Sequence, residues 1–442
     1  MRKPFFLIVF IFSGFTSSAY AYSPFEGSDT AYTLKDCIAY AMKNQPAANQ
    51  AFIDEDIARV NKNIALSAWL PQVNLGAAYQ HYIQQPTSFL PANGIVSPVK
   101  TGVINTVTPA VGVTQNIFSN DALLAGRASR LYISLSKENT EAALINLVTA
   151  VSKAFYDVLL SEGRINVYKE DTGRLLKNQS DAYHRYVSGI VDKVDYKQAT
   201  ISLNNSLSQL KTATEDVAAK YAVLKQTMGS RPEHVFTVKY DSAEIMKDIY
   251  ADTLAALRVT NRVEYRQLQL MKDIQRETTT YYRLGFLPTL SAFYNYNYPF
   301  LNNKASELYN TAYPNSYIGL QLNVSVFTGF RRLENMHKSR LQETRIDWDI
   351  VNLELSIFSE YQKALSTYKS NFYYLHTQSE NINMAREVYN IVKLQYTEGI
   401  KAYLDVIISE SGLQTSEINY LNALFQVMQS KVDFEKATGK IN

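Results

Sequence analysis

The chain has 442 residues, a formal charge of +3, and only 17 glycines and 12 prolines. Arg2 and Lys3 contribute two of those charges, so the remainder is nearly neutral and has no basic footprint for nucleic acid. The scarcity of glycine and proline favours long, uninterrupted elements. Cys37 is the single cysteine, which excludes an intramolecular disulfide, and we expect a half-buried structural thiol.

The N-terminus has the pattern of a secretory signal. Arg2 and Lys3 precede an apolar run, and residues 18–21 read Ser-Ala-Tyr-Ala, a small-residue cleavage site. We therefore expect a signal peptide over 1–21. No later stretch approaches 18 consecutive apolar residues, so we expect no helical membrane span. Membrane insertion of the mature chain would then require strands.

One pattern occurs twice. The sequence YVSGIVDKVD at 186–195 returns as YTEGIKAYLD at 396–405, at an offset of 210 that needs no gap. Two leucine–proline pairs, each lying before one of these two segments, match as well, at a slightly different offset. Self-similarity of this kind indicates two copies of one structural unit. We therefore predict a first repeat over 22–229 and a second over 230–442.

Each repeat begins with helical periodicity. In the first, Thr33 and Asp36 can cap a helix, and Pro46 should end or kink it. The spacing predicts a helix over 33–68, interrupted at Pro46, and a helix over 250–284 in the second repeat.

Alternating segments follow these helices. Strands are predicted over 72–84 and 102–118, and over 288–299 and 315–327. One face is apolar and rich in tyrosine and the other is small and polar, which suits a barrel with lipid outside and water inside. A soluble sandwich with one wet face is the alternative. A proline-containing segment between the first two strands is predicted to be a long loop, and the first copy has eight more residues there than the second.

Long amphipathic helices complete each repeat. They are predicted over 120–186 and 192–228, and over 330–397 and 402–437, the longer ones reaching about 100 Å at 1.5 Å per residue. Gly189 and Gly399 separate the members of each pair, and glycine suits a helix C-cap because it adopts positive φ without strain. Each repeat is therefore a helical hairpin plus two strands. Four strands cannot close a transmembrane barrel, which needs about eight, so membrane strands would have to be pooled by several copies.

The chain resembles the TolC-like outer-membrane efflux and secretion proteins over essentially its whole mature length. The resemblance rests on the duplication, the leucine–proline entry to the first strand of each copy, the tyrosine, glycine and aspartate of the helical turns, and two segments that leave the last strands. These are Ile117-Phe118-Ser119 and Val326-Phe327-Thr328-Gly329.

This resemblance implies a mainly α protein with a transmembrane β-barrel. It implies a homotrimer with a 12-stranded barrel among the lipids of the cell outer membrane and an α-helical tunnel through the periplasm. The function implied is the channel of a tripartite multidrug efflux or type I secretion system, which docks a periplasmic adaptor (membrane fusion protein) belonging to an inner-membrane pump.

The resemblance also implies roles for particular residues. The tips that dock the adaptor would hold Gly189, Ile190, Gly399 and Ile400. The positions that latch the closed entrance would be Asp195, Tyr396 and Lys401, with lysine in place of the family's usual arginine. Asp405 would face the pore in a ring of carboxylates, of which the second position is Ile408 here. Alternatively, Asp195 and Asp405 only offset the dipoles of the helices that they begin.

The sequence contains no constellation typical of catalysis. The five histidines are scattered, and no zinc, phosphate-loop, dinucleotide or nucleophile motif occurs. We therefore predict neither an enzyme nor a bound cofactor or metal. A periplasmic or surface coiled-coil scaffold or adhesin without a pore is the alternative function, although it leaves the symmetric strands without a purpose.

Overall fold

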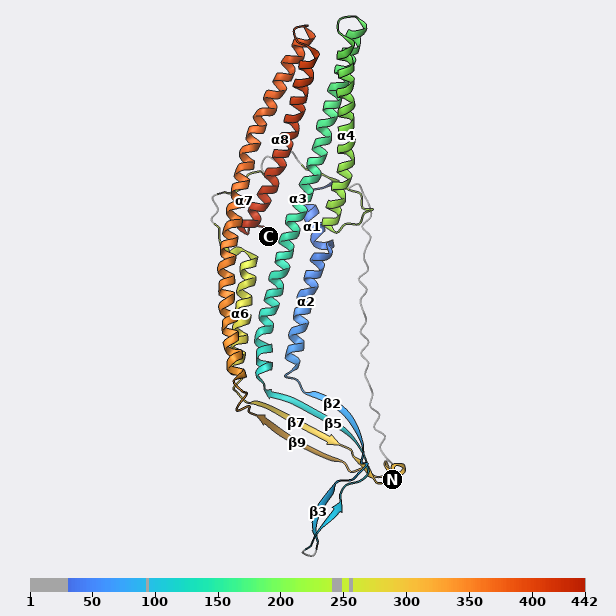
Figure 1. Cartoon of the computed structure of the whole chain (residues 1–442), viewed down its shortest axis with the longest axis vertical. Helices are drawn as coiled ribbons and strands as arrows, with labels where there is room; N and C mark the ends of the chain where they lie inside the picture. Colours follow the sequence, from blue (N-terminus) through green and yellow to red (C-terminus); the bar gives the residue numbers. More distant parts are fainter. Residues whose placement is uncertain (1–30, 93–94, 241–248, 254–256, 442) are drawn as a thin grey trace.

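The structure is a computed structural model that describes residues 31–92, 95–240, 249–253 and 257–441. The signal peptide predicted over 1–21 lies outside the described residues. Helices occupy most of the molecule's length, and the strands are gathered at one end (Figure 1). The two hairpin tips lie together at the opposite end, so the repeated turns and the sheet are as far apart as the fold allows.

The first repeat opens with a broken helix, as predicted. Helix α1 covers Leu34–Asn44 and α2 covers Pro46–Ser67, with Gln45 in an extended conformation between them. Thr33 and Asp36 form the expected capping box, in which each side chain bonds the other residue's backbone N–H. Cys37 is fully buried rather than half-buried, and burial raises the pKa of its thiol to about 12. It is therefore an unreactive core residue.

The corresponding helix of the second repeat is shorter than predicted. Helix α6 covers Val263–Leu284, whereas a helix was expected from residue 250. Arg262 is extended like its repeat counterpart Gln45, and its buried guanidinium donates to Glu264, Glu360 and the carbonyl oxygen of Ala437. These contacts hold the chain out of a helix where no proline marks the break.

Four antiparallel strands form the main sheet, in the order β2, β5, β7, β9. They cover Gln72–His81 (β2), Asn105–Phe118 (β5), Thr289–Asn297 (β7) and Asn315–Asn323 (β9), and a short strand, β8 (Phe300–Asn302), also pairs with β5. Strands β2 and β9 end before residues 84 and 327, where the sequence predicted their ends. Strand β2 ends at His81 because its partner β5 begins opposite it at Asn105, and β9 ends at Asn323 because its partner β7 begins opposite it at Thr289. The β5–β7 pairing joins the two repeats.

The predicted long loop between β2 and β5 contains a hairpin of its own. Strands β3 (Thr87–Ala92) and β4 (Ile95–Lys100) pair antiparallel and project beyond the main sheet (Figure 1). The prolines in this segment suggested a loop, but Pro98 lies opposite Phe89 in a two-stranded ladder whose edges are free. Proline is tolerated on such edge strands.

Two helical hairpins make up the rest. Helix α3 (Asn120–Val187) pairs with α4 (Lys193–Met228), and α7 (Arg331–Thr397) pairs with α8 (Tyr403–Thr438), close to the predicted bounds. Midway along the molecule, the core gathers Phe155, Leu224, Met428 and Phe434 beneath α1 and the short parallel pair β1 (Ala31–Tyr32) and β6 (Thr237–Val238). We call this level the equator.

Helix α3 is apolar enough over part of its length to cross a membrane by length and composition alone. No such helix was expected from the sequence. About two-fifths of the stretch is buried, and Val151, Phe155 and Val158 of the same helix lie in the equatorial core. We therefore interpret it as a core segment of a long helix in a bundle.

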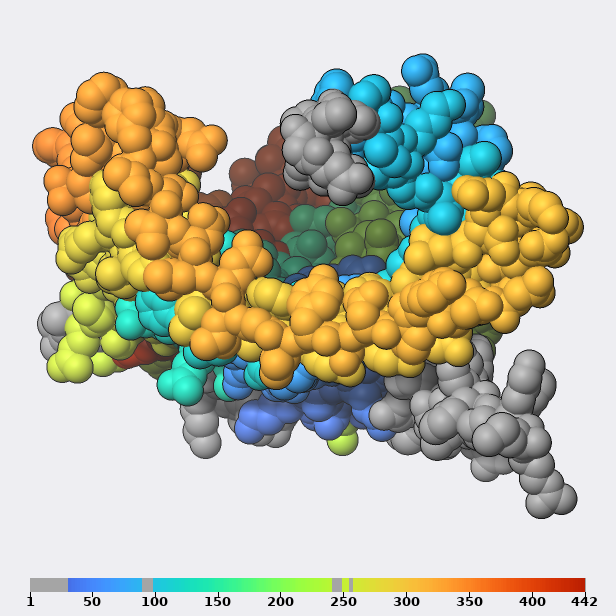
Figure 2. Space-filling view, turned by 90° about the horizontal axis from the view of Figure 1, so that it is seen from below, coloured from blue at the N-terminus to red at the C-terminus, as the bar shows by residue number. Residues whose placement is uncertain are grey.

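Seen from the strand end, the chain is a trough rather than a closed tube. Figure 2 shows the strands and lower helices curving around a hollow that is open on one side. Within the described residues the sheet has two free edges, β2 and β9. Large apolar side chains of both edge strands are exposed, including Leu75 (77% exposed) and Ile318 (81% exposed).

Candidate functional site: the hairpin tips

The two repeated turns have the same backbone. Gly189 and Gly399 have φ values of 70° and 76°, in the left-handed region that glycine favours. In the first turn the N–H of Ile190 donates to the carbonyl oxygen of Arg185 and that of Gly189 to Tyr186; in the second, the N–H of Ile400 donates to Gln395. This double closure is the Schellman motif, which satisfies the last carbonyl groups of a helix.

In the part of the chain that the structure describes, the space beside these two glycines is open. A Cβ added at Gly189 or Gly399 would meet no atom within 4 Å. The next residues, Ile190 and Ile400, are 69% and 72% exposed. Each tip therefore presents a bare glycine beside an exposed isoleucine, a small apolar surface with space in front of it.

Tyr396 lies one turn below the second tip and is buried, unlike its repeat counterpart Tyr186. The guanidinium carbon of Arg185 lies 5.0 Å from the centre of the Tyr396 ring, and an Arg185 Nη donates to the carbonyl oxygen of Thr397 at 3.0 Å. Arg185 lies in the last turn of α3, in the first hairpin, and Tyr396 lies in the last turn of α7, in the second. This cation–π contact and hydrogen bond therefore tie the two tips together.

The hydroxyls of Tyr396 and Tyr403 are buried and have no hydrogen-bond partner among the described residues. The two rings pack with centroids 5.4 Å apart. Burial raises the pKa of Tyr396, which the Arg185 charge partly opposes and the Asp195 charge reinforces. Asp195 is thus close enough to act on Tyr396 electrostatically, and its own pKa is raised by burial and by Asp192.

Lys401 and Asp405 lie together at the start of α8, with Nζ and Oδ1 3.9 Å apart. Asp405 also accepts from the N–H of Ala402 at 3.2 Å, which caps the helix start. The structure thus brings Lys401 to Asp405, and it gives no hydrogen bond or ion pair between Lys401 and Asp195 within the described chain. Ile408, one turn further along α8, is exposed.

A cavity of about 350 Å³ separates the hairpins just below the tips. Its lining comes from both hairpins and includes Asp181, His184, Arg185, Lys393 and Tyr396. At this level the hairpins are held by a small apolar core and by the contacts of Arg185, and an open space lies beside these contacts. Such a loosely packed junction suits a part that moves.

Sequence reasoning missed a charged cluster below this cavity. It contains Asp171, Arg174 and Asn178 of α3, and Glu410 and Glu417 of α8; we call it the inter-hairpin cluster. Its residues recur at spacings of three, four and seven, which are the spacings of a buried helix face. Polar residues at apolar spacing on two helices were the signal that could have found it.

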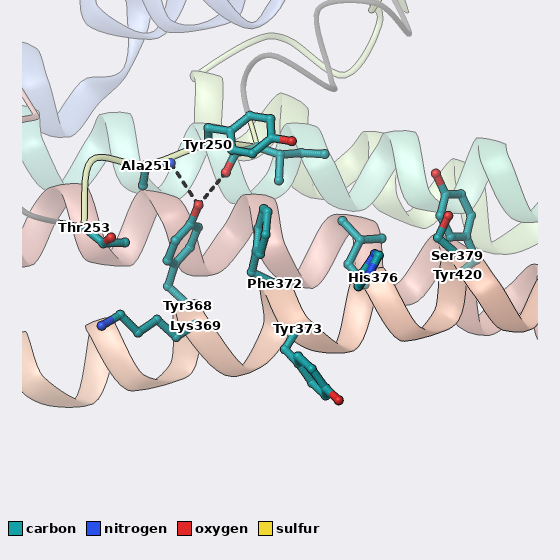
Figure 3. Close-up of a pocket in the computed structure, with 12 residues that line it drawn as sticks. Tyr250, Ala251, Thr253, Tyr368, Lys369, Phe372, Tyr373, His376, Ser379 and Tyr420 are labelled. Carbon is teal, nitrogen blue, oxygen red and sulfur yellow. Dashed lines mark hydrogen bonds between the residues drawn. The ribbon is translucent and has the colours of Figure 1, made fainter.

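A second cavity lies at the equator, between α7 and the residues before α6. It measures about 630 Å³ and is walled largely by aromatic rings (Figure 3). The Tyr368 hydroxyl accepts from the N–H of Ala251 and donates to the carbonyl oxygen of Ile249, both at 2.9 Å, so it fixes the loop over α7. Residues on both sides of that loop lie outside the described part of the chain, and we assign the cavity no ligand.

Comparisons with known proteins agree with the fold and the location. Residues 38–230 match the family described as outer membrane efflux protein. Outer membrane protein TolC of Escherichia coli is 19% identical, with 95% of this chain and 85% of TolC covered. The alkaline protease secretion protein AprF of Pseudomonas aeruginosa is 18% identical, with 92% and 83% covered.

Solved structures show the same fold. A crystal structure of CusC has a TM-score of 0.74 at 14% identity, with 92% of this chain and 91% of that chain covered. The outer membrane protein VceC of Vibrio cholerae has a TM-score of 0.71 at 13% identity, with 92% and 96% covered. The matched family is one of outer-membrane channels and not an enzyme family. The resemblance drawn from the repeated turns is thus confirmed: the chain is similar to the TolC-like outer-membrane efflux and secretion proteins.

Proposed function

We propose that the chain is the outer-membrane channel of a tripartite efflux or type I secretion system. Once docked to a periplasmic adaptor and an inner-membrane pump, it would give cargo a passive duct from the periplasm to the exterior. The observation that carries the proposal is the incomplete sheet: four strands with two free edges and exposed apolar faces, attached to helices about 100 Å long.

Three copies would complete the barrel. An unpaired strand edge in lipid costs several kcal/mol for each unsatisfied backbone group, so β2 and β9 both need neighbours. Joining the β9 edge of one copy to the β2 edge of the next makes a head-to-tail ring. Three chains with four strands each would give the 12-stranded barrel implied by the resemblance. The open, curved trough in Figure 2 supports this proposal.

The tips would be the docking points for the adaptor. Their glycines are open to solvent and the isoleucines beside them are exposed, so a partner's apolar side chain could approach the backbone closely. Below them, Tyr396 holds a buried hydroxyl without an acceptor, and Asp195 supplies a carboxylate nearby. We propose that Asp195 and Tyr396 latch the closed entrance, with Lys401 and Asp405 at its rim.

Conductance across a planar lipid bilayer tests the duct. The purified chain in detergent should have the mass of three subunits and should give discrete current steps. Divalent cations on the pore side should shrink those steps, and Asp405→Asn should weaken this block because it removes the proposed ring of carboxylates. A protein that binds vesicles without passing current would instead be a scaffold or adhesin.

A further inference from the structure

The inter-hairpin cluster lies between two separate apolar cores. The equatorial core includes Val158 on α3 and Leu424 on α8, and a smaller core near the tips includes Ala182, Tyr396 and Val406. On α8, Glu410 and Glu417 flank Leu413, which belongs to the core near the tips, and on α3, Asp171 to Asn178 lie between Val158 and Ala182 in the sequence. A polar layer therefore borders the core near the tips on the side that faces the equator.

The layer contains more negative than positive charge. Arg174 contacts all three carboxylates: Asp171 at 3.3 Å, Glu410 at 3.3 Å and Glu417 at 3.2 Å. Those residues are 1%, 3% and 5% exposed. The second guanidinium, Arg386 of α7, lies 3.8 Å from Glu417 and is mostly exposed. Three buried carboxylates thus share one half-buried cation, and a buried charge without compensation is costly.

Neighbouring groups distinguish Glu410 from the other two acids. Asp171 accepts from Ser206 of α4 at 2.6 Å and from Gln414 of α8 at 2.7 Å, and Glu417 has both guanidiniums. Glu410 has Arg174 and the amide of Asn178, at 2.7 Å, and it faces Asp171. The phenols of Tyr389 and Tyr403 complete its surroundings on α7 and α8.

We propose that Glu410 is a proton-operated connection between the two hairpins, which holds them together more tightly when it is protonated. A neutral Glu410 no longer repels Asp171, and its hydroxyl can donate within the layer. Ionised, it adds a third buried negative charge beside one arginine and favours separation of α3 from α8. Because the cluster lies directly below the tips, the connection would make resting closure of the entrance depend on periplasmic pH, a consequence that rests on the proposed function.

Glu410 changes its protonation state close to neutral pH. Burial, with a further contribution from Asp171, raises the pKa of Glu410 from 4.5 to about 7 in the closed arrangement. An acid whose pKa is raised in the closed form stabilises that form when protonated. The coupling is therefore complete below about pH 4.5, declines as pH rises, and reaches its minimum above about pH 7. Separation should be about 30-fold easier at pH 8 than at pH 5.5.

Amide hydrogen exchange in the purified, assembled protein tests this directly. In the wild type, protection of residues 171–182 and 405–417, corrected for intrinsic rates, should fall about 30-fold between pH 5.5 and pH 8. Glu410→Gln keeps the shape and the hydrogen bond to Arg174 or Asn178 but cannot ionise. It should stay protected at both pH values. Equal pH dependence in wild type and E410Q would overturn the proposal.

A matched control lies on α3. Glu162 is a half-buried carboxylate whose pKa is also raised by burial, but it accepts from Tyr221 of its own hairpin. Glu162→Gln should leave the pH dependence of the exchange unchanged, and a loss as large as that in E410Q would contradict the assignment to Glu410. Glu417→Gln frees Arg174 for Glu410, so the midpoint of the exchange change should move to lower pH.

The hydrogen-exchange measurements need neither a partner protein nor a conductance recording. A wild-type infrared band of a protonated carboxyl near pH 6 that E410Q lacks would support the proposal independently, and its presence in both would count against it. Resting conductance then tests the link to the entrance: it should rise with pH in the wild type and stay low in E410Q. If the protein shows the change in hydrogen exchange but passes no current at any pH, the proposal for Glu410 stands and the proposed channel function is wrong.

Discussion

Each of the four long helices is followed by a glycine with the same C-cap geometry. Two of these glycines lie at the equator and two lie at the tips. At the equator, Gly229 and Gly439 follow α4 and α8 with φ values of 67° and 68°. A Cβ at Gly229 would lie 2.6 Å from the Cα of Gln45, and one at Gly439 would lie 3.1 Å from the carbonyl oxygen of Asn261. At the tips, Gly189 and Gly399 have empty space. The same glycine cap is thus packed against another part of the chain at the equator, and it has open space beside it at the tips.

The difference separates two reasons for a glycine. At the equator the residue is fixed by the fold itself, because the break between two helices approaches it closely. Asn44 and Asn261, which occupy equivalent positions in the two repeats, make that approach. At the tips the fold requires only a positive φ, and the absence of any neighbour leaves the surface available to another molecule.

The largest effect is expected at the equator. Gly229→Ala places a methyl group against backbone atoms in addition to straining a positive φ, and should destabilise the chain by about 3 kcal/mol. Gly439→Ala should cost less, because its nearest contact is longer. Gly189→Ala has only the conformational cost of about 1 kcal/mol. Thermal unfolding of the assembled protein measures this series, and equal losses at all four positions would remove the distinction.

Export should respond in the opposite order. Gly189→Trp or Gly399→Trp fills the space in front of the tip, so we expect drug efflux or polypeptide secretion to be lost while barrel assembly is retained. Export in cells that carry the cognate pump and adaptor measures this effect, with trimer content of the outer membrane as the control. Normal export by both variants would show that the tips do not dock the adaptor.

The contacts between the tips should govern resting closure. Arg185→Ala removes a cation–π contact and a hydrogen bond worth about 1 to 2 kcal/mol together, so resting conductance should rise about tenfold. Arg185→Lys keeps the charge without the planar guanidinium and should give an intermediate rise. Unchanged closed-state current in Arg185→Ala would show that the tips are held elsewhere.

Asp195→Ala tests the proposed latch in the same recording. If Asp195 accepts from Tyr396 in the closed state, both Asp195→Ala and Tyr396→Phe should raise resting conductance, and the double variant should rise no further. Additive effects would mean that the two residues act on closure independently.

Lys401 should matter least. Its ion pair with Asp405 is exposed and 3.9 Å long, and such pairs contribute about 0 to 1 kcal/mol. Lys401→Ala should leave the unfolding temperature unchanged within error and alter conductance only slightly. A rise in resting current as large as that of Arg185→Ala would instead assign Lys401 to the latch.

Much of this fold could be predicted because periodicity and duplication report on local structure. The helix breaks at Gly189 and Gly399 were visible as glycines, and the break before α2 was visible as Pro46. The equivalent break at Arg262 was not visible, because the buried guanidinium of Arg262 produces it by pairing with Glu264 and with Glu360, which is far away in the sequence. The strand ends depended on where the neighbouring strand stops, which no single strand encodes.

The candidate site divides in the same way. Positions of the tips and of Tyr396 followed from the repeated motif, and their roles remain predictions. Arg185 and the inter-hairpin cluster were missed because each acts through a contact between α3 and α7 or α8, helices more than two hundred residues apart in the sequence. Tyr403 was missed because its ring acts by packing on Tyr396 across the turn. A contact between the two repeats does not recur within either copy, so comparing the two copies could not reveal it.

The free edges of the sheet have a genetic consequence. Since each subunit would lend one edge to either neighbour, a variant that folds but cannot open should impair every ring that includes it. When altered and normal chains are made in equal amounts and mix at random, about one eighth of three-membered rings would contain normal chains alone. Mutations at the entrance should therefore be dominant, whereas those that prevent a subunit from folding should be recessive.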